Sequence, residues 1–517
     1  MDLAELGTKQ ISFQPKLRDV VALYILVHVR FIAIMTVSKG SCHHARVVRL
    51  LVLFVLLQVG LTSTLTSEDE TMKFMTELTE SRVIGGTVAV QKAGELVWSK
   101  GFGFASEELD VPLRDYHIFP VGSNTKFFTA VAIYQLQEKG LLNVSDAVNG
   151  YIDPADFGLD GPWCPTIHGQ EQLGCQEPTI RQLLQMSSGL LPTDDQSCGT
   201  PNTSWTPSNW FWPYRIDKLE LTFGALSGDS GNWINGKASA AELLRFQNSM
   251  HLPMLHAPGA QYCYVNTNFN IAGYVIEKLT NMSFTSYLEE FILKPANLSN
   301  TYYWLGGQGM EPQGIRKNVV SIPGYTTTFT NQTGKGAPAF KVVNRVEWLP
   351  TDLSTVAGAA GAMFSNVFDL LKWYNTFNAR PEVIGLSKES LALLTEPLQP
   401  LTIRLFNGSY AQGIGVEPLP ASKMLDYTGG IWGYLTHIQY WVNPSDPSKS
   451  DAVLFFSNVN PIIPSGPNGA CSVRSAQNGA PISLEPGACN PNGADMTTYV
   501  TNHIAQMWNI TGRFSSS

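Results

Sequence analysis

The pattern Ser123-Asn124-Thr125-Lys126 is the first candidate for chemistry in the chain. Helical spacing follows it at once, so Ser123 and Lys126 are predicted to share one face at the start of a helix. A serine hydroxyl is a weak nucleophile that needs an adjacent base, and a partly desolvated lysine amine can serve as that base. The free N–H groups of a helix N-terminus also favour developing negative charge. Taken alone, so short a pattern more often means an N-cap serine followed by a surface lysine.

Two further segments carry groups that could act with this pair. Tyr264 offers a phenol that could move the serine proton to a leaving group, and Asn266 an amide that could hold the lysine or the substrate. Tyr427 stands two residues before Gly429 and Gly430, ahead of a predicted strand. Glycines there let a substrate backbone lie close, and an N–H could help to bind an oxyanion. Each segment alone also fits a structural role, a packed loop tyrosine and a strand-entry turn.

The elements that must position these residues are strands at both ends of the chain and helices between them. A strand-like pattern begins at residue 75 and includes a hairpin over 83–98, and strands return over 412–417, 435–442 and 452–458. Helical spacing occurs from Phe128 to Gly140 and over 180–186, 241–249, 271–279, 284–291, 367–377 and 496–508. This layout predicts an α/β (α+β) domain over 67–517, with sheet halves over about 75–125 and 351–517 and a helical insert over about 126–350. The segment 461–494, rich in Pro, Gly, Ser and Asn, is predicted to be a pinned surface loop.

In this order, the three segments resemble those of the serine β-lactamase-related superfamily, which holds class C β-lactamases, D,D-peptidases and esterases on one fold. Family-like stretches also follow in family order over 83–103, 119–142, 179–190, 257–279, 358–371 and 410–416. The resemblance covers residues 75–460 apart from inserts. It implies a β-lactamase/transpeptidase-like fold, in which an antiparallel sheet is flanked by helices and a helical domain is inserted.

The resemblance also implies a role for each candidate residue. Ser123 would be the acylated nucleophile, with Lys126 as its partner base. Tyr264 would act as general base and acid, and Asn266 would hold Lys126 and the substrate amide. The backbone N–H groups of Ser123 and Gly430 would bind the oxyanion.

Two departures from the family pattern bear on function. Tyr427 stands where β-lactamases and D,D-peptidases carry a lysine that helps to bind the substrate carboxylate, so the pocket loses a positive charge. Met186 replaces a frequent histidine, a change expected to affect packing. We therefore expect a serine hydrolase of the esterase or amidase type, acting on a neutral ester or amide. The alternatives are a catalytically inactive glycoprotein that uses the fold as a binding or structural module and, less favoured, a D-peptidase or β-lactamase.

The first 66 residues are predicted to be an upstream segment and a secretory signal. An apolar stretch over 50–61 follows Arg46 and Arg49 and precedes small residues. It is shorter than the ~20 residues that a spanning helix needs. A signal anchor facing outside is the competing interpretation, and Met35 is a candidate for the true start. The expected location is extracellular, with no stable membrane span after the signal is removed.

Cysteines and glycosylation signals agree with export. An even number of cysteines follows the signal, which suggests three disulfides. Cysteines that lie close in sequence are expected to pair first, as Cys164–Cys175 and Cys471–Cys489. The remaining two would then form the third disulfide, Cys198–Cys263. Seven N-x-S/T triplets indicate a glycoprotein, and so a eukaryotic secreted member of the family, at Asn143, Asn202, Asn281, Asn297, Asn331, Asn407 and Asn509. No Cys/His spacing suggests zinc, and we expect no metal and no cofactor.

The amino-acid composition and net charge argue against two classes of protein. The chain of 517 residues has 34 Lys and Arg against 42 Asp and Glu, a formal net charge of −8, and 44% hydrophobic residues. The apolar content argues against a disordered protein, and the acidic balance against a nucleic-acid binder. The expected partner is a small-molecule or peptide substrate with an ester or amide bond.

Overall fold

The computed structural model describes residues 66–79, 85–106, 110–157, 159–167, 169–190, 254–303, 325–330, 339–345, 357–397, 399–400, 409–431, 434–461, 472–474, 481–483 and 494–510. The predicted signal lies outside these residues. The chain divides into two compact units, Met1–Asp69 and Glu70–Ser517. In the described end of the first unit, Asp69 N–H donates to Thr66 Oγ1 and Thr66 N–H to Asp69 Oδ2, a reciprocal cap at a helix start. The elements below belong to the second unit, apart from the first residues of α3.

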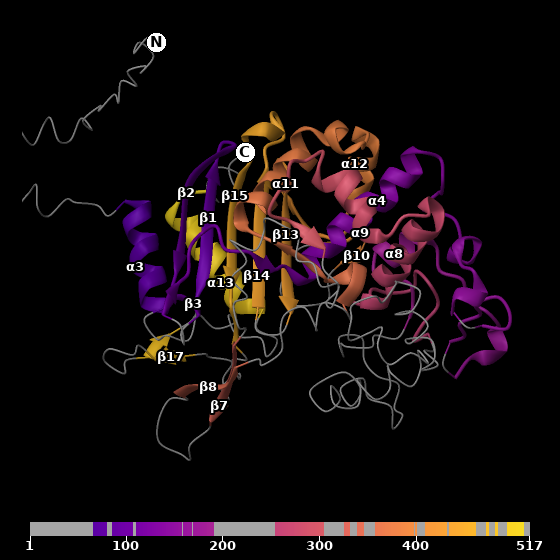
Figure 1. Cartoon of the computed structure of the whole chain (residues 1–517), viewed down its shortest axis with the longest axis horizontal. Coiled ribbons are helices and arrows are strands. Elements are labelled where there is room, and N and C mark those ends of the chain that lie inside the picture. Colours follow the sequence, from indigo (N-terminus) through magenta and orange to yellow (C-terminus); the bar gives the residue numbers. More distant parts are fainter. Residues whose placement is uncertain are drawn as a thin grey trace, which may run out of the picture. The chain divides into compact units, whose positions relative to one another are not determined.

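An eight-stranded antiparallel sheet forms the centre of the second unit (Figure 1). Its strand order is β10 (Gln399–Pro400), β11 (Ser409–Tyr410), β12 (Gly415–Leu419), β13 (Ser422–Ile431), β14 (Tyr434–Val442), β15 (Asp451–Ser457), β1 (Gly86–Lys92) and β2 (Glu95–Phe102). The N-terminal hairpin therefore completes a sheet whose other strands come from the C-terminal part of the chain. β1 joins β15 with Gly86 opposite Ser457.

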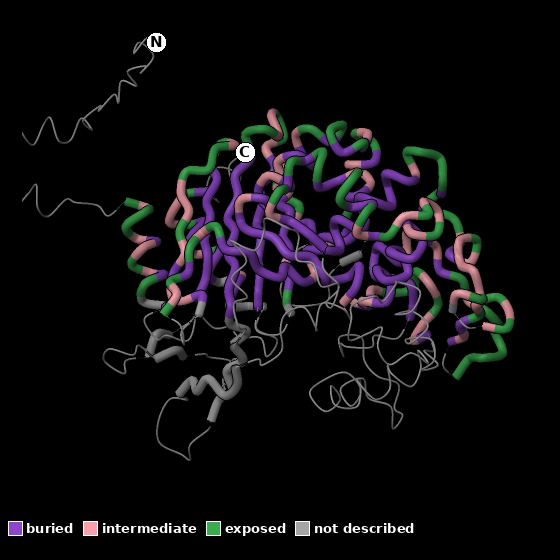
Figure 2. The backbone as a smooth tube through the Cα atoms, in the orientation of Figure 1, coloured by how far each residue is buried: buried purple, intermediate pink, exposed green. Residues whose placement is uncertain are grey.

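Helices cover both faces of this sheet, so its central strands are buried throughout (Figure 2). Successive side chains of β15 point to opposite faces. Leu454 and Phe456 belong to the core shared with α4 (Thr125–Glu138), α8 (Asn266–Thr280) and α11 (Val367–Ala379). Val453 and Phe455 belong to a second core, which includes residues of α3 (Ser67–Thr79) and α13 (Ala494–Met507).

Shorter elements connect these layers. The helical ones include η1 (Gly122–Asn124), α5 (Ile180–Leu184), α9 (Phe284–Leu288), η8 (Gly358–Ala360) and α12 (Lys388–Leu394). The remaining strands are β3 (Phe104–Ser106), β4 (Val111–Pro112), β5 (Phe119–Pro120), β6 (Tyr302–Tyr303), β7 (Tyr325–Thr330), β8 (Ala339–Arg345), β9 (Met363–Ser365), β16 (Val459–Pro461), β17 (Ser472–Arg474) and β18 (Pro481–Ser483).

The predicted fold class is confirmed: an antiparallel sheet flanked by helices, with α4, α5, α8, α9, α11 and α13 where helical spacing placed them. The helix predicted over 241–249 lies outside the described residues. Three expectations were wrong in detail. Residues 75–79 are the end of α3, because Met75 packs in the second core with Val88 and Val90 of β1, and the buried Thr71 lies one helical turn before it. A strand pair, β7–β8, occurs where helical signals were expected, and part of 461–494 forms the strands β17 and β18. The boundaries of a separate helical insert stay a prediction.

Candidate active site

Ser123 and Lys126 lie at the junction of η1 and α4. The short strand β5 leads into this turn, and one helical turn separates the two residues, so their side chains share a face. Lys126 Nζ donates to Ser123 Oγ at 3.0 Å and to the Ala360 carbonyl at 2.8 Å. Lys126 is fully buried, whereas Ser123 is half-buried and keeps access to solvent. The pair predicted from the sequence is therefore formed, with the lysine enclosed and the serine reachable.

Tyr264 completes a hydrogen-bonded triad with these two residues. Its hydroxyl donates to Ser123 Oγ at 2.6 Å, and Lys126 Nζ lies 4.8 Å from the centroid of its ring. The tyrosine stands in the loop before α8, where the neighbouring Cys263 N–H donates to the Met186 carbonyl at 2.7 Å and Val265 N–H to Met186 Sδ at 3.3 Å. Met186 is buried, so the residue that departs from the family pattern packs beneath the tyrosine loop.

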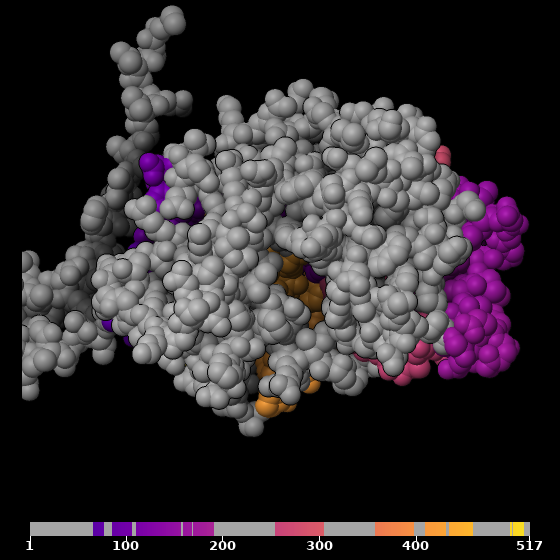
Figure 3. Space-filling model, turned by 90° about the horizontal axis from the view of Figure 1, so that it is seen from below, coloured from indigo at the N-terminus to yellow at the C-terminus, as the bar shows by residue number. Residues whose placement is uncertain are grey.

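The strand β13 approaches the serine turn so closely that two glycines are required. Gly122 has φ +51°, and a Cβ there would lie 2.7 Å from the Gly430 carbonyl oxygen and 2.9 Å from its nitrogen. A Cβ on Gly429 would lie 2.0 Å from the Val121 carbonyl oxygen. Gly430 is exposed, and orange atoms from the later part of the chain are visible near the centre of the face shown in Figure 3. The segment Tyr427–Gly430 was expected to precede a strand and instead lies within β13, which holds it against the turn.

Two buried phenols extend the triad away from Ser123. The Tyr427 hydroxyl lies 3.5 Å from the Tyr264 hydroxyl and 2.9 Å from that of Tyr410 on β11. Tyr427 is 4% and Tyr410 1% exposed. Burial raises the pKa of both hydroxyls well above the ordinary tyrosine value, and nearby Tyr264 adds to the effect. Both groups are therefore neutral and keep their protons at physiological pH.

The structure brings together most of the predicted site. Ser123, Lys126, Tyr264 and Tyr427 are linked through their side chains, and Gly429 and Gly430 lie against the residues that precede Ser123. Asn266 begins α8, two residues after Tyr264, and its role in holding Lys126 stays a prediction.

Sequence reasoning missed two supporting residues. Tyr410 lies in the family-like stretch 410–416, which was the only available signal for it. Thr436 on β14 accepts a hydrogen bond from Asn124 Nδ2 at 2.9 Å and donates to the Val121 carbonyl at 3.2 Å, which ties the serine turn to the sheet. No sequence pattern distinguishes Thr436, because the serine-turn residues that it bonds, Val121 and Asn124, lie more than 300 residues away.

A family model described as Beta-lactamase matches residues 68–468, more than half of the chain. The chain belongs to the beta-lactamase family. Among solved structures, it is similar to D-amino acid amidase from Ochrobactrum anthropi SV3 at 18% identity and a TM-score of 0.54, covering 84% of this chain and 98% of the amidase. It is also similar to an octameric penicillin-binding protein homologue from Pyrococcus abyssi at 20% identity and a TM-score of 0.53, covering 86% and 77% of the two chains. At these identities the likeness bears on the fold.

Curated family relatives match a shorter region. Protein flp from Staphylococcus aureus is 26% identical over 227 residues, which make up 44% of this chain and 36% of flp. Penicillin-binding protein 4* from Bacillus subtilis is 26% identical over 226 residues, 43% of this chain and 39% of that protein. The match thus spans little more than a third of the length of these relatives.

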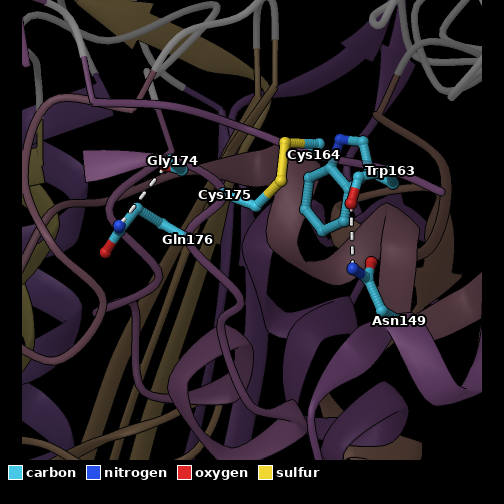
Figure 4. Close-up of a disulfide and its surroundings, with 6 residues drawn as sticks. All are labelled: Asn149, Trp163, Cys164, Gly174, Cys175 and Gln176. Atoms are coloured by element: carbon cyan, nitrogen blue, oxygen red, sulfur yellow. Dashed lines mark hydrogen bonds between the residues drawn. A yellow bond between two sulfur atoms is a disulfide. The ribbon is translucent and has the colours of Figure 1, made fainter. Parts of the chain in front are cut away.

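The predicted disulfide Cys164–Cys175 is present, close to the Trp163 carbonyl that accepts a hydrogen bond from Asn149 Nδ2 at 2.8 Å (Figure 4). Cys263 is also disulfide-bonded. The other predicted disulfide partners lie outside the described residues: Cys198, Cys471 and Cys489.

Four of the predicted glycosylation sites can be located, and all four asparagines are exposed: Asn143, Asn281, Asn297 and Asn509. The other three lie outside the described residues: Asn202, Asn331 and Asn407. Glycosylation itself stays a prediction.

Within the described part of the chain, no helix is both long and apolar enough to cross a membrane.

Proposed function

We propose that this protein is a secreted serine hydrolase that cleaves a neutral ester or amide through an acyl-enzyme on Ser123. One observation carries the proposal: the hydroxyl of Ser123 is within hydrogen-bonding distance of both Lys126 Nζ and the Tyr264 hydroxyl. A serine needs an adjacent base to become a nucleophile, and a second group to protonate the leaving atom. The site offers one candidate for each task. Secretion rests on the predicted signal over residues 50–61.

The chemistry begins when the Lys126–Tyr264 pair has lost one proton. The pair accepts the proton of Ser123 as Oγ bonds to the substrate carbonyl carbon, and the carbonyl electrons move to oxygen. Tyr264 then gives a proton to the leaving nitrogen or oxygen as the carbon–leaving group bond breaks. Water, deprotonated by the same pair, attacks the acyl-enzyme, which releases the acid and restores the serine hydroxyl.

The oxyanion formed in each step needs donors fixed in advance. The backbone N–H groups of Ser123 and Gly430 are the proposed pair, because Gly430 lies against Gly122, the residue before Ser123, so closely that a Cβ on Gly122 would be 2.9 Å from the Gly430 nitrogen. Removing one such donor in other enzymes costs about 10²–10³ in turnover.

The proposed substrate class rests on the two buried phenols next to Tyr264. Tyr427 and Tyr410 are uncharged, so they offer a carboxylate-bearing substrate no cation at this wall of the site. A neutral ester or amide has no such need. The name of the similar D-amino acid amidase is consistent with an amide substrate.

A fluorophosphonate probe tests the proposal against the alternative of an inactive binding module. The purified protein should be labelled at Ser123, and the Ser123→Ala variant should lose labelling and turnover of a chromogenic short-chain ester while keeping its unfolding temperature. Wild-type turnover in the alanine variant would exclude Ser123 as the nucleophile. Parallel assays with esters, amides, β-lactams and D-peptides separate the esterase or amidase proposal from a D-peptidase or β-lactamase.

A further inference from the structure

We infer that Tyr410 is a positioning residue of the proposed hydrolase: its hydroxyl donates to Tyr427 and thereby directs the single proton of Tyr427 to the oxygen of Tyr264. This inference rests on the proposed function and adds a residue to it. It concerns which hydroxyl donates in each hydrogen bond along a row of four. The row joins the hydroxyl oxygens of Tyr410, Tyr427, Tyr264 and Ser123 in that order.

The direction of each hydrogen bond follows from counting protons, because a phenol has only one. Tyr264 uses its proton on Ser123 at 2.6 Å, which leaves its oxygen as an acceptor. Tyr410 is 1% exposed, and among the described residues the Tyr427 oxygen, 2.9 Å away, is the oxygen recorded within hydrogen-bonding distance of its hydroxyl. A buried hydroxyl proton needs an acceptor. Tyr410 therefore donates to Tyr427, and the Tyr427 proton is left for Tyr264.

The consequence is a donor at the oxygen that carries negative charge when Tyr264 gives up its proton. Hydrogen bonding to a charged form favours that form, and chains of hydrogen bonds strengthen one another in a low dielectric. The Tyr427–Tyr264 distance of 3.5 Å is long for a neutral pair and has room to shorten once charge develops. Without Tyr410, Tyr427 would be free to rotate its proton away from the site.

The other titratable groups around Tyr264 do not duplicate this contribution. Among the described residues they are Lys126 from α4, which lies over the ring, and Tyr262, whose ring packs against that of Tyr410 at 5.5 Å. Lys126 stabilises the phenolate by its charge over the ring, while Tyr427 is the phenol whose hydroxyl lies 3.5 Å from the oxygen of Tyr264.

The test is the pH dependence of the rate at which the fluorophosphonate labels Ser123. Labelling requires that the Lys126–Tyr264 pair has lost a proton, so its acidic limb reports the apparent pKa of that pair. Tyr427→Phe removes the donor that stabilises the deprotonated pair, so the acidic limb of the pH–rate profile should move to higher pH by about one unit. At a fixed pH on that limb, this corresponds to labelling that is about tenfold slower. Tyr410→Phe should move it in the same direction by a smaller amount.

Two comparisons separate positioning from a structural role. Tyr440→Phe is the matched control, since Tyr440 is a buried phenol on β14 whose hydroxyl donates to Asn375 Oδ1 at 2.9 Å. It should lower stability without moving the limb. The double variant Tyr410→Phe/Tyr427→Phe should shift the limb no further than Tyr427→Phe alone, because Tyr410 acts only through Tyr427.

Each failure has a distinct signature. If the wild-type protein is not labelled, the proposed function is wrong. If the wild type is labelled but Tyr410→Phe keeps its pH profile, or if the two shifts simply add, the positioning role of Tyr410 is wrong while the hydrolase remains.

Discussion

The hydroxyl of Tyr264 lies 2.6 Å from the hydroxyl of Ser123, although 141 residues separate them in the chain. The contact exists because the loop that carries Tyr264 is fixed by Met186 on one side and begins the buried helix α8 on the other. Each side chain needs a different part of the fold to reach this point: α4 for the serine, the loop before α8 for the tyrosine. The site therefore depends on the assembled fold more than on any one segment.

Lys126→Met should lower kcat/KM for an activated ester by about 10²–10⁴, the usual contribution of a positioned base. Methionine fills a similar buried volume without a charge, so the unfolding temperature should change little or rise. Lys139→Met is the matched control, because Lys139 follows the same helix at its far end and its Nζ lies 3.9 Å from the Phe291 ring centroid. Steady-state kinetics and thermal unfolding of both variants give the answer. Turnover in Lys126→Met within threefold of the wild type would exclude Lys126 as the base.

Gly122→Ala should reduce turnover by 10²-fold or more while the protein still folds. The new Cβ would lie 2.7 Å from the Gly430 carbonyl oxygen and would push β13 away from the serine turn, separating the two proposed oxyanion donors by roughly an ångström. Gly140→Ala is the control: Gly140 also has a positive φ, of +67°, but no atom lies within 4 Å of the added Cβ. Both variants carry similar backbone strain, so equal activity in the two would contradict the proposed oxyanion site.

Tyr427→Lys should increase kcat/KM toward carboxylate-bearing β-lactams by about tenfold or more, because a charge-assisted hydrogen bond contributes about 1.5–3 kcal/mol. The ammonium would stand beside Tyr264, where the neutral phenol stands now. Tyr427→Phe, which adds no charge, should show no such gain. Hydrolysis of a carboxylate-bearing β-lactam relative to a neutral ester measures the effect. If the lysine variant gains nothing, the neutral wall does not set the substrate class.

His117 should make the protein less stable in mild acid. Burial lowers the pKa of this side chain below its ordinary value of 6.5, and its Nδ1 accepts a hydrogen bond from the Arg114 backbone N–H at 2.8 Å. Below pH 6.5 the unfolded chain therefore binds a proton that the folded chain does not, so the free energy of unfolding falls as the pH drops. Above that pH the contribution is fully present.

Urea unfolding at pH 5, 6 and 7 measures the slope. In His117→Asn, whose amide oxygen can accept the same hydrogen bond but does not titrate, the free energy of unfolding should depend less on pH over this range. An unchanged slope would show that other groups control the acid response.

The sequence was sufficient for most of the described helices, though not for α3 and α12, and for the Ser123–Lys126 pair, because both depend on local spacing. Ser123 and Lys126 are one turn apart, and any helix over this segment brings them together. The disulfide Cys164–Cys175 could also be predicted from the sequence, since only a short loop separates the two cysteines. Family resemblance supplied the link from Ser123 to Tyr264.

The remainder depends on contacts between distant segments. The sequence predicts that residues 427–430 precede a strand, because two consecutive glycines are typical of a turn. In the structure β13 pairs with β14 along these residues, and this pairing outweighs the local preference of the glycines. Tyr410 carries no local sign of its role, which arises only when β11, β13 and the Tyr264 loop meet.

The central sheet joins strands from distant parts of the chain. Beside the pairing of β1 with β15, Ser457 Oγ donates to the Gly85 carbonyl across 372 residues. A ribosome releases the N-terminal part first, at about 5–20 residues per second. Ser123 and Lys126 thus emerge long before β13 and the Gly429–Gly430 segment that meets them. A nascent chain therefore carries the proposed nucleophile before the strand that completes the site has been made. If the protein is the proposed hydrolase, it is inactive throughout synthesis and gains activity only when its C-terminal strands join the sheet.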